Sequence, residues 1–102
     1  MRISNLSAGL PLLPGGRAAS KVTIGFEMSQ GAEATVEIRL GGRVVRHLTT
    51  SRAISAGVNQ MLWDLRDDRG IALPGGTYTL EVTAHTSEGD VTRAVTPLLL
   101  TR

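Results

Sequence analysis

The sequence predicts an all-β protein, an immunoglobulin or fibronectin-III-like β-sandwich of about seven antiparallel strands. Several segments alternate apolar and polar residues with a period of two, which is the pattern of a strand with one buried face. Clusters of glycine, proline, aspartate and serine separate these segments at intervals of about 8 to 12 residues. No segment repeats its apolar residues with the period of an α-helix. A small β-barrel is the alternative architecture.

The composition indicates one globular domain. The chain has 102 residues, 41% of them hydrophobic and 20% charged, and a single core of this size buries about two-thirds of the unfolded surface. The net charge of +2 comes from scattered arginines rather than from a basic tract. Cysteine is absent, which excludes disulfides and thiolate metal sites. The sequence shows no secretory signal pattern and no run of about 20 apolar residues, so we expect no membrane span.

Residues 1–20 have the least regular pattern, and we expect them to form an N-terminal arm or an edge strand. Leu10, Leu12 and Leu13 are apolar, but Pro11 and Pro14 interrupt them. Proline cannot donate a hydrogen bond to a neighbouring strand and is therefore confined to sheet edges and extended segments.

Residues 21–96 carry the regular pattern of the sandwich. The expected strands cover 21–28, 33–40, 43–49, 58–64, the segment around Tyr78, and 91–96. The pair Gly41-Gly42 is typical of a two-residue hairpin turn. Residues 51–57 are expected to form a loop, and 97–102 an apolar C-terminal tail. The large and branched residues in inward phase predict the core: Phe26, Val36, Ile38, Trp63, Tyr78, Leu80 and Val82.

The stretch from Trp63 to Ala84 joins the strand with the only tryptophan to the strand with the only tyrosine, Tyr78. Two turn signals lie between these strands. Aspartate side chains close local turns through nearby backbone groups, and glycine supplies the positive φ that such turns need. The residues of this turn motif are Asp64, Asp67, Gly70, Pro74 and Gly76.

The order of these features over residues 22–95 resembles the Ig-like domain of the flagellar hook-capping protein family, which recurs at the C-termini of many bacterial surface and secreted proteins. The matching positions are Phe26 in the opening strand, Ala34, Val36 and Ile38 in an A-x-V-x-I strand, Gly42, Val45 and Leu48 in the hairpin return, Ala56, Gly57, Asn59, Trp63 and Asp64 in the entry to the W-D pair, and Asp67, Gly70, Leu73, Pro74, Gly76 and Tyr78 in a D-x-x-G-x-x-L-P-x-G-x-Y motif. The chain departs from the family at Leu65, where glycine usually follows W-D, and we expect a different local bend there.

The resemblance implies a non-catalytic building block of an assembly on or outside the cell. We therefore expect a structural module, extracellular or at the cell surface, that binds copies of itself or neighbouring protein subunits and needs no cofactor. The apolar residues near the two termini are candidate assembly arms that add as strands to a neighbour's sheet edge; they are Leu10, Leu12, Leu13, Leu98, Leu99 and Leu100. The alternative for these residues is that they complete the sheets of their own chain.

Other functions find less support in the sequence. Asp64, Asp67 and Asp68 offer carboxylates for a Ca²⁺ loop, but the spacing is not that of an EF-hand, and aspartates in tight turns usually bind nearby amides. His47 and His85 have no evident carboxylate or cysteine partner, whereas zinc needs three or four ligands. No catalytic motif is present, so we expect no enzyme activity.

Two binding alternatives remain. Outward arginines could form a stripe that meets phosphates; they are Arg39, Arg43, Arg46 and Arg93. Outward glutamates share the same faces, so a mixed-charge solvated sheet is the simpler interpretation and no nucleic acid partner is expected. A carbohydrate-binding or substrate-presenting accessory domain of a larger secreted enzyme is the second function class. It requires exposed aromatic residues, whereas Trp63 and Tyr78 are in inward phase.

Overall fold

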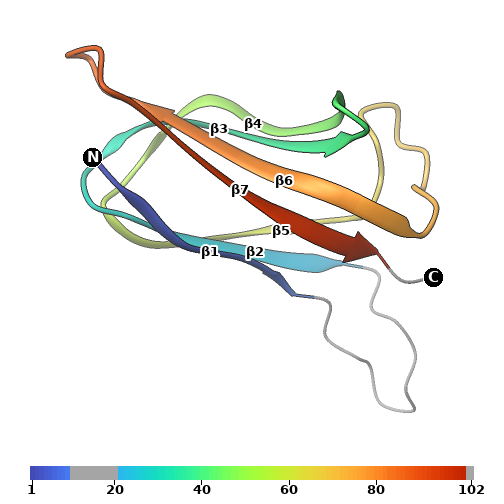
Figure 1. The fold of residues 1–102 in the computed structure, drawn as a ribbon. Helices are drawn as coiled ribbons and strands as arrows, with labels where there is room; N and C mark the ends of the chain where they lie inside the picture. Colours follow the sequence, from blue (N-terminus) through green and yellow to red (C-terminus); the bar gives the residue numbers. More distant parts are fainter. Residues whose placement is uncertain (10–20, 101–102) are drawn as a thin grey trace.

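Seven antiparallel strands form two facing sheets in the computed structural model, which describes residues 1–9 and 21–100 (Figure 1). The strands are β1 (Ile3–Gly9), β2 (Val22–Met28), β3 (Ala32–Leu40), β4 (Arg43–Ile54), β5 (Gly57–Trp63), β6 (Gly76–His85) and β7 (Val91–Leu100). The first sheet has the order β1-β2-β5, and the second has the order β4-β3-β6-β7. This architecture confirms the immunoglobulin-like sandwich predicted from the alternation of apolar residues.

The core lies between the two sheets and is built from the inward residues of every second position. All seven predicted core residues are buried, at 1% exposure or less. The rings of Trp63 and Tyr78 meet edge to face, with centroids 6.5 Å apart and an interplanar angle of 73°. This pair links the end of β5 in one sheet to the start of β6 in the other. Aliphatic side chains fill the remaining volume because the chain has only three aromatic residues.

Within the expected N-terminal arm or edge strand over 1–20, residues 3–9 form strand β1 at the edge of the three-stranded sheet. It pairs antiparallel with β2 and contains a one-residue bulge between Ser4 and Ser7. Asn5 occupies this bulge with φ +53°, a conformation that asparagine tolerates better than most residues. The bulge shifts the side-chain alternation by one residue, which hid the strand from the sequence pattern. Leu10, Leu12 and Leu13 lie outside the described residues.

Strand β7 corrects the expected end of the last strand at residue 96. It continues through Pro97 to Leu100 and pairs with β6 along its whole length. Leu98 and Leu100 are buried in the core, whereas Leu99 between them is 65% exposed. The C-terminal leucines therefore alternate as a strand does and complete their own sheet.

The edge strands β1 and β7, one from each sheet, lie close together along one side of the sandwich, as Figure 1 shows. The hydroxyl of Thr92 in β7 donates a 3.1 Å hydrogen bond to the carbonyl of Met1, just before β1. Residues that are 91 positions apart in the sequence thus join the two sheets at this side.

Strand β4 corrects the expected loop over 51–57, because it runs on to Ile54. Its register against β3 shifts three times, between Ala34 and Arg39, and each shift inserts one extra residue into β4. Ser51 lies at one of these bulges with φ +46°, and its N–H donates to Thr35 Oγ1 at 3.0 Å. The bulges twist this edge of the sheet and interrupt its regular hydrogen-bonding pattern.

Candidate functional site

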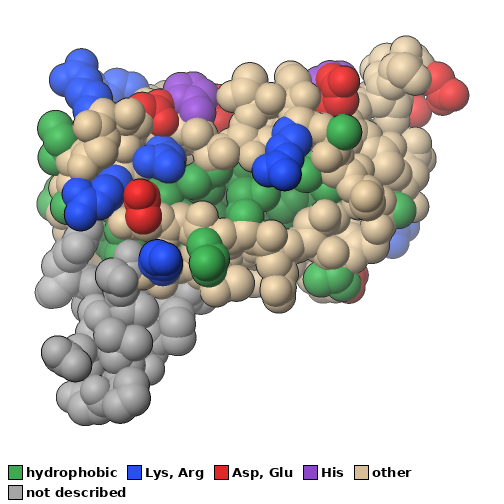
Figure 2. All heavy atoms as spheres, turned by 180° about the vertical axis from the view of Figure 1, so that it is seen from behind, with side chains coloured by type: hydrophobic (Ala, Val, Ile, Leu, Met, Phe, Trp, Pro, Cys, Tyr) green, Lys and Arg blue, Asp and Glu red, His purple; other side chains and the backbone are tan. Residues whose placement is uncertain are grey.

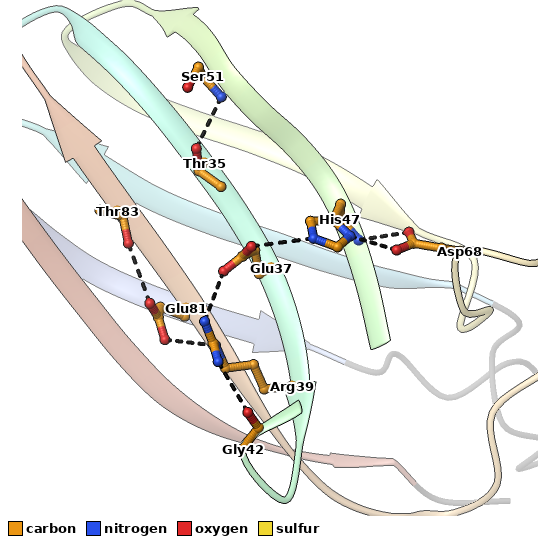
Figure 3. Close-up of polar contacts among 9 residues, drawn as sticks. All are labelled: Thr35, Glu37, Arg39, Gly42, His47, Ser51, Asp68, Glu81 and Thr83. Atoms are coloured by element: carbon orange, nitrogen blue, oxygen red, sulfur yellow. Dashed lines mark hydrogen bonds and ion pairs between the residues drawn. The ribbon is translucent and has the colours of Figure 1, made fainter. Parts of the chain in front are cut away.

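A chain of charged side chains crosses the outer face of the four-stranded sheet, and Figure 3 shows the part of it on β4, β3 and β6. Each side chain contacts the next one. When the histidine is protonated, negative and positive charges alternate along the whole chain of contacts. The members are Asp68, His47, Glu37, Arg39, Glu81 and Arg93. Outward positions of neighbouring strands stand side by side in an antiparallel sheet, so residues far apart in sequence meet here. We call these six residues the charge ladder.

His47 on β4 lies between two carboxylates. Its Nδ1 is 2.6 Å from Oδ2 of Asp68, and its Nε2 is 3.6 Å from Oε2 of Glu37. The backbone N–H of His47 also donates to Oδ1 of Asp68 at 2.8 Å. This N–H bond, reinforced by the His47 ring, holds the pKa of the Asp68 carboxyl below its ordinary value. The arrangement fastens the turn that carries Asp68 to strand β4.

Arg39 on β3 sits at the centre of the charge ladder. Its Nη2 donates to Oε1 of Glu37 at 3.3 Å, and its Nη1 donates to the carbonyl of Gly42 at 3.3 Å. Nε lies 3.1 Å from Oε2 of Glu81, at an angle that makes the contact an ion pair without a hydrogen bond. Arg93 on β7 approaches Glu81 from the other side at 3.9 Å. The ladder therefore spans all four strands of this sheet.

His85 at the end of β6 also has a carboxylate partner, which the sequence analysis missed. Its Nε2 lies 2.9 Å from Oε2 of Glu33, which stands directly opposite on β3. Neither this pair nor that of His47 is visible in sequence, because the partners are 52 and 21 residues apart. Only the strand register identifies them. A shallow surface depression of about 570 Å³ lies beside His85 and Glu33.

The three aspartates of the turn region bind three different sets of protein donors. Asp64 accepts from the N–H of Arg66 at 3.2 Å, which closes a local turn. Asp67 accepts from the N–H groups of Arg69 and Ile71, both at 2.9 Å. Asp68 turns instead toward β4, as described above. Within residues 1–9 and 21–100, no three acidic, histidine or cysteine residues converge as metal ligands.

The turn motif folds into a small hairpin that closes one end of the sandwich. A bridge pairs Arg66 with Ala72, and the N–H of Gly70 donates to the carbonyl of Asp67 at 3.0 Å. Gly70 has φ +83°, which glycine adopts without a steric cost. The N–H of Leu73 donates to the carbonyl of Leu65 at 3.0 Å, and both leucine side chains are buried. The hairpin thus presents its polar residues to solvent and inserts its leucines into the core.

Leu65 adopts the backbone conformation that glycine would adopt most easily. Its φ is +63°, and its side chain is 2% exposed. A left-handed conformation costs a non-glycine residue roughly 1–2 kcal/mol. The expectation of a different bend at this position is therefore wrong. The backbone takes the bend that glycine favours, and leucine tolerates it because its side chain fills the core.

All three aromatic residues of the chain are buried, so none is available on the surface for stacking. Phe26, Trp63 and Tyr78 are at most 1% exposed. Stacking on exposed rings is the usual way in which proteins hold single-stranded nucleic acid. Figure 2 shows basic, acidic and histidine side chains interspersed on the face opposite to the view of Figure 1, rather than gathered in one basic patch. The described surface therefore offers neither an aromatic stacking platform nor a single basic patch.

Comparison with known proteins identifies relatives of this chain. The family described as the FlgD Ig-like domain matches residues 13–88. The crystal structure of FlgD from P. aeruginosa superposes with a TM-score of 0.65 at 22% identity, over 78% of this chain and 61% of that chain. No curated protein matches. In the part of the chain described, no helix is long and apolar enough to cross a bilayer.

Proposed function

Because this chain belongs to the FlgD Ig-like domain family, we propose that it is a non-enzymatic structural module that acts through protein–protein contacts in an extracellular or cell-surface assembly. Its role would be that of a hook-cap-like scaffold or of a subunit that assembles with copies of itself. The match to FlgD supports the hook-cap relationship, since that protein shares the fold. The chain spans about 61% of the FlgD structure. Because the match is partial, the role in an assembly and the export to the cell exterior are proposed for this chain.

One observation carries the proposal: the side chains best suited to chemistry are engaged with one another on an open sheet. His47 is held between Asp68 and Glu37, and His85 is held by Glu33. Cross-strand charge pairs of this kind brace a sheet. A braced sheet is suited to bearing contacts with neighbouring subunits.

The burial of the C-terminal leucines bears on which residues we propose as assembly arms. Leu98 and Leu100 fill the core of their own sandwich, so strand addition by the C-terminal leucines would unfold the donor. We retain the arm role for Leu10, Leu12 and Leu13, and we consider Leu99 separately below. Deleting residues 1–18 or 97–102 would remove β1 or the end of β7. Point substitutions are therefore the cleaner test.

Light scattering and negative-stain microscopy of the 102-residue chain test this function, with a glycan array in parallel. Concentration-dependent oligomers without glycan binding would support a structural module. The double variant Leu12→Ser, Leu13→Ser tests the arm, and Leu40→Ser, at a residue 42% exposed beside the β3–β4 turn, is its control. Specific glycan binding by a folded, monomeric chain would overturn the proposal in favour of a carbohydrate-binding accessory domain.

A further inference from the structure

Strand β7 presents a long, regular and apolar edge of the four-stranded sheet. It pairs with β6 over ten consecutive positions without a register shift. Its outward side chains include Val91, Val95 and Leu99, which are 66%, 52% and 65% exposed. Native proteins usually protect sheet edges with bulges, charges or short strands, because an unprotected edge can pair with another chain. This edge carries one charge, Arg93, and one proline, Pro97.

The same outward residues also direct their backbone groups toward the open side of β7. The N–H of Thr86 donates to the carbonyl of Asp90 at 3.0 Å, so Thr86 and Asp90, one pair beyond the register of β6 and β7, form a hydrogen-bonded pair. Hydrogen-bonded and non-hydrogen-bonded pairs alternate in antiparallel sheets. Counting from Asp90, Thr92 and every second residue after it therefore bond to β6. The residues whose N–H and C=O groups face away from β6 are Val91, Arg93, Val95, Pro97 and Leu99, of which Pro97 has no N–H.

We propose that β7 pairs antiparallel with β7 of a second copy of this chain, about a two-fold axis at Val95. This proposal names the partner and the surface of the structural module proposed above, and it rests on that function. The pairing joins two four-stranded sheets into one continuous sheet. It is isologous, so the same residues contribute from both copies.

The side-chain pattern selects this register. With the axis at Val95, Val95 faces its own copy, Val91 faces Leu99 of the second copy, and Arg93 faces Pro97 of the second copy. All exposed apolar residues of the edge then meet apolar partners, which stabilises cross-strand pairs. The two arginines stand four residues apart along the sheet, about 13 Å, which exceeds the screening length of roughly 8 Å in physiological salt. An axis at Arg93 would instead place like charges opposite each other.

The backbone pattern agrees with the side-chain pattern. Each Val91–Leu99 pair and the central Val95 pair can exchange two N–H···O=C bonds, because both residues face the open edge. Each Arg93–Pro97 pair can form one bond, from the Arg93 N–H to the Pro97 carbonyl. The missing N–H of Pro97 thus removes one bond per pair without blocking the approach of the second strand.

The other edges that the structure describes are less suited to this pairing. Strand β4 carries three bulges, and β1 carries one bulge. Strand β5 has no register shift and exposes Val58 and Leu62, so it is the nearest rival. It has only seven residues, however, compared with ten in β7. Short edge strands are less effective templates for pairing.

Charge substitutions at the two edges separate these possibilities. Val95→Lys places two lysines opposite each other at the axis, and like charges there destabilise the pair. We expect the dimer dissociation constant, measured by sedimentation, to rise by at least about tenfold. Val58→Lys, at a residue 69% exposed on β5, should leave it unchanged. A mixture of Val95→Lys and Val95→Glu chains should recover the dimer, because opposite charges then face each other.

Cysteine cross-linking tests the register, since the natural chain has no cysteine. Facing residues of a hydrogen-bonded pair have Cα atoms about 5.5 Å apart, within disulfide range. Val95→Cys should therefore cross-link to itself under mild oxidation, while Val58→Cys should not. Val91→Cys and Leu99→Cys should each remain uncross-linked alone and should cross-link when mixed.

The outcomes distinguish this proposal from the general function. Association that survives Val95→Lys and is lost with Val58→Lys would overturn β7 pairing and assign the interface to β5, with the structural role intact. A wild-type chain that stays monomeric at every concentration, without Val95→Cys cross-linking, would also overturn β7 pairing. Specific glycan binding by that monomer would in addition overturn the structural role.

Discussion

The phenolic hydroxyl of Tyr78 donates a 2.6 Å hydrogen bond to the carbonyl of Pro74, four residues earlier in the chain. This contact is the tyrosine corner found near the start of the sixth strand in many immunoglobulin-like sandwiches. It ties the hairpin of the turn motif to the first residues of β6. The tyrosine ring at the same time packs against Trp63.

Removing only this hydroxyl should destabilise the fold without repacking the core. Tyr78→Phe keeps the ring but leaves the Pro74 carbonyl without this donor. The hydrogen bond is partly buried, and a typical intramolecular hydrogen bond contributes about 0.5–1.5 kcal/mol to stability. We expect the urea midpoint to fall accordingly, with an unchanged slope of the transition. An unchanged midpoint would mean that water replaces the hydroxyl at no cost.

Truncating the tryptophan should have a larger effect. Trp63 is fully buried, and its Nε1 donates to the carbonyl of Arg66 at 3.0 Å. We expect Trp63→Ala to cost roughly 3–5 kcal/mol of unfolding free energy, the usual range for a large core aromatic. Trp63 is the only tryptophan, so unfolding must be followed by circular dichroism rather than by tryptophan fluorescence. Trp63→Phe, which retains a ring, should cost less, and equal losses for the two variants would contradict this account.

Substitutions at Leu65 should reverse the usual order of alanine and glycine. Leu65→Ala removes a buried side chain and keeps the strain of a left-handed backbone at φ +63°. Leu65→Gly removes the same contacts but relieves the strain. We expect both to be destabilising and the glycine variant to be about 1 kcal/mol more stable than the alanine variant. Thermal denaturation of the two variants measures the difference, and a less stable glycine variant would show that Leu65 is not strained.

The pair of Asp68 and His47 should make stability depend on pH at the acid side. The pKa of Asp68 is lowered in the folded state from its ordinary value of 3.8, first by the His47 N–H and then by the ring. Its contribution to stability is therefore fully present above pH 3.8 and is lost as the pH falls through the lower folded value. Asp68→Asn should reduce stability at neutral pH and have little effect in strong acid. The effect should be modest because the side chain is 45% exposed.

A double-mutant cycle assigns this dependence to the contact. If Asp68→Asn and His47→Ala act on the same interaction, their effects on the denaturation midpoint at neutral pH will not add. Additive effects would mean that the two residues stabilise the fold independently. The cycle also removes the contribution of the other neighbours of Asp68.

Much of the sandwich could be predicted from the sequence because most of its strands keep a strict period of two. Val22, Ile24 and Phe26 in β2, for example, all point inward, as the alternation indicates. The bulge at Asn5 broke that period in β1 and hid the strand. At the end of β7, the run Leu98-Leu99-Leu100 has no polar residue to reveal the alternation. In both places the neighbouring strand, rather than the local pattern, determines the structure.

The polar contacts were less predictable. The turn motif could be predicted because glycine and aspartate act on nearby backbone groups. The partners of His47 could not, since Asp68 and Glu37 reach it from a turn and from another strand. The bend at Leu65 was also unexpected, because a leucine in a left-handed conformation is rare. Only the packed sandwich supplies the buried contacts that permit it.

The contact between β1 and β7 determines when the fold can be completed. Met1 and Thr92 are joined by a hydrogen bond across the two sheets, and the core includes Leu98 and Leu100. During synthesis, the residues of β7 become available only after the other six strands that the structure describes have been made. Folds dominated by such distant contacts also form slowly, in roughly milliseconds to seconds. The sandwich therefore cannot close until strand β7 is available to pack beside β1.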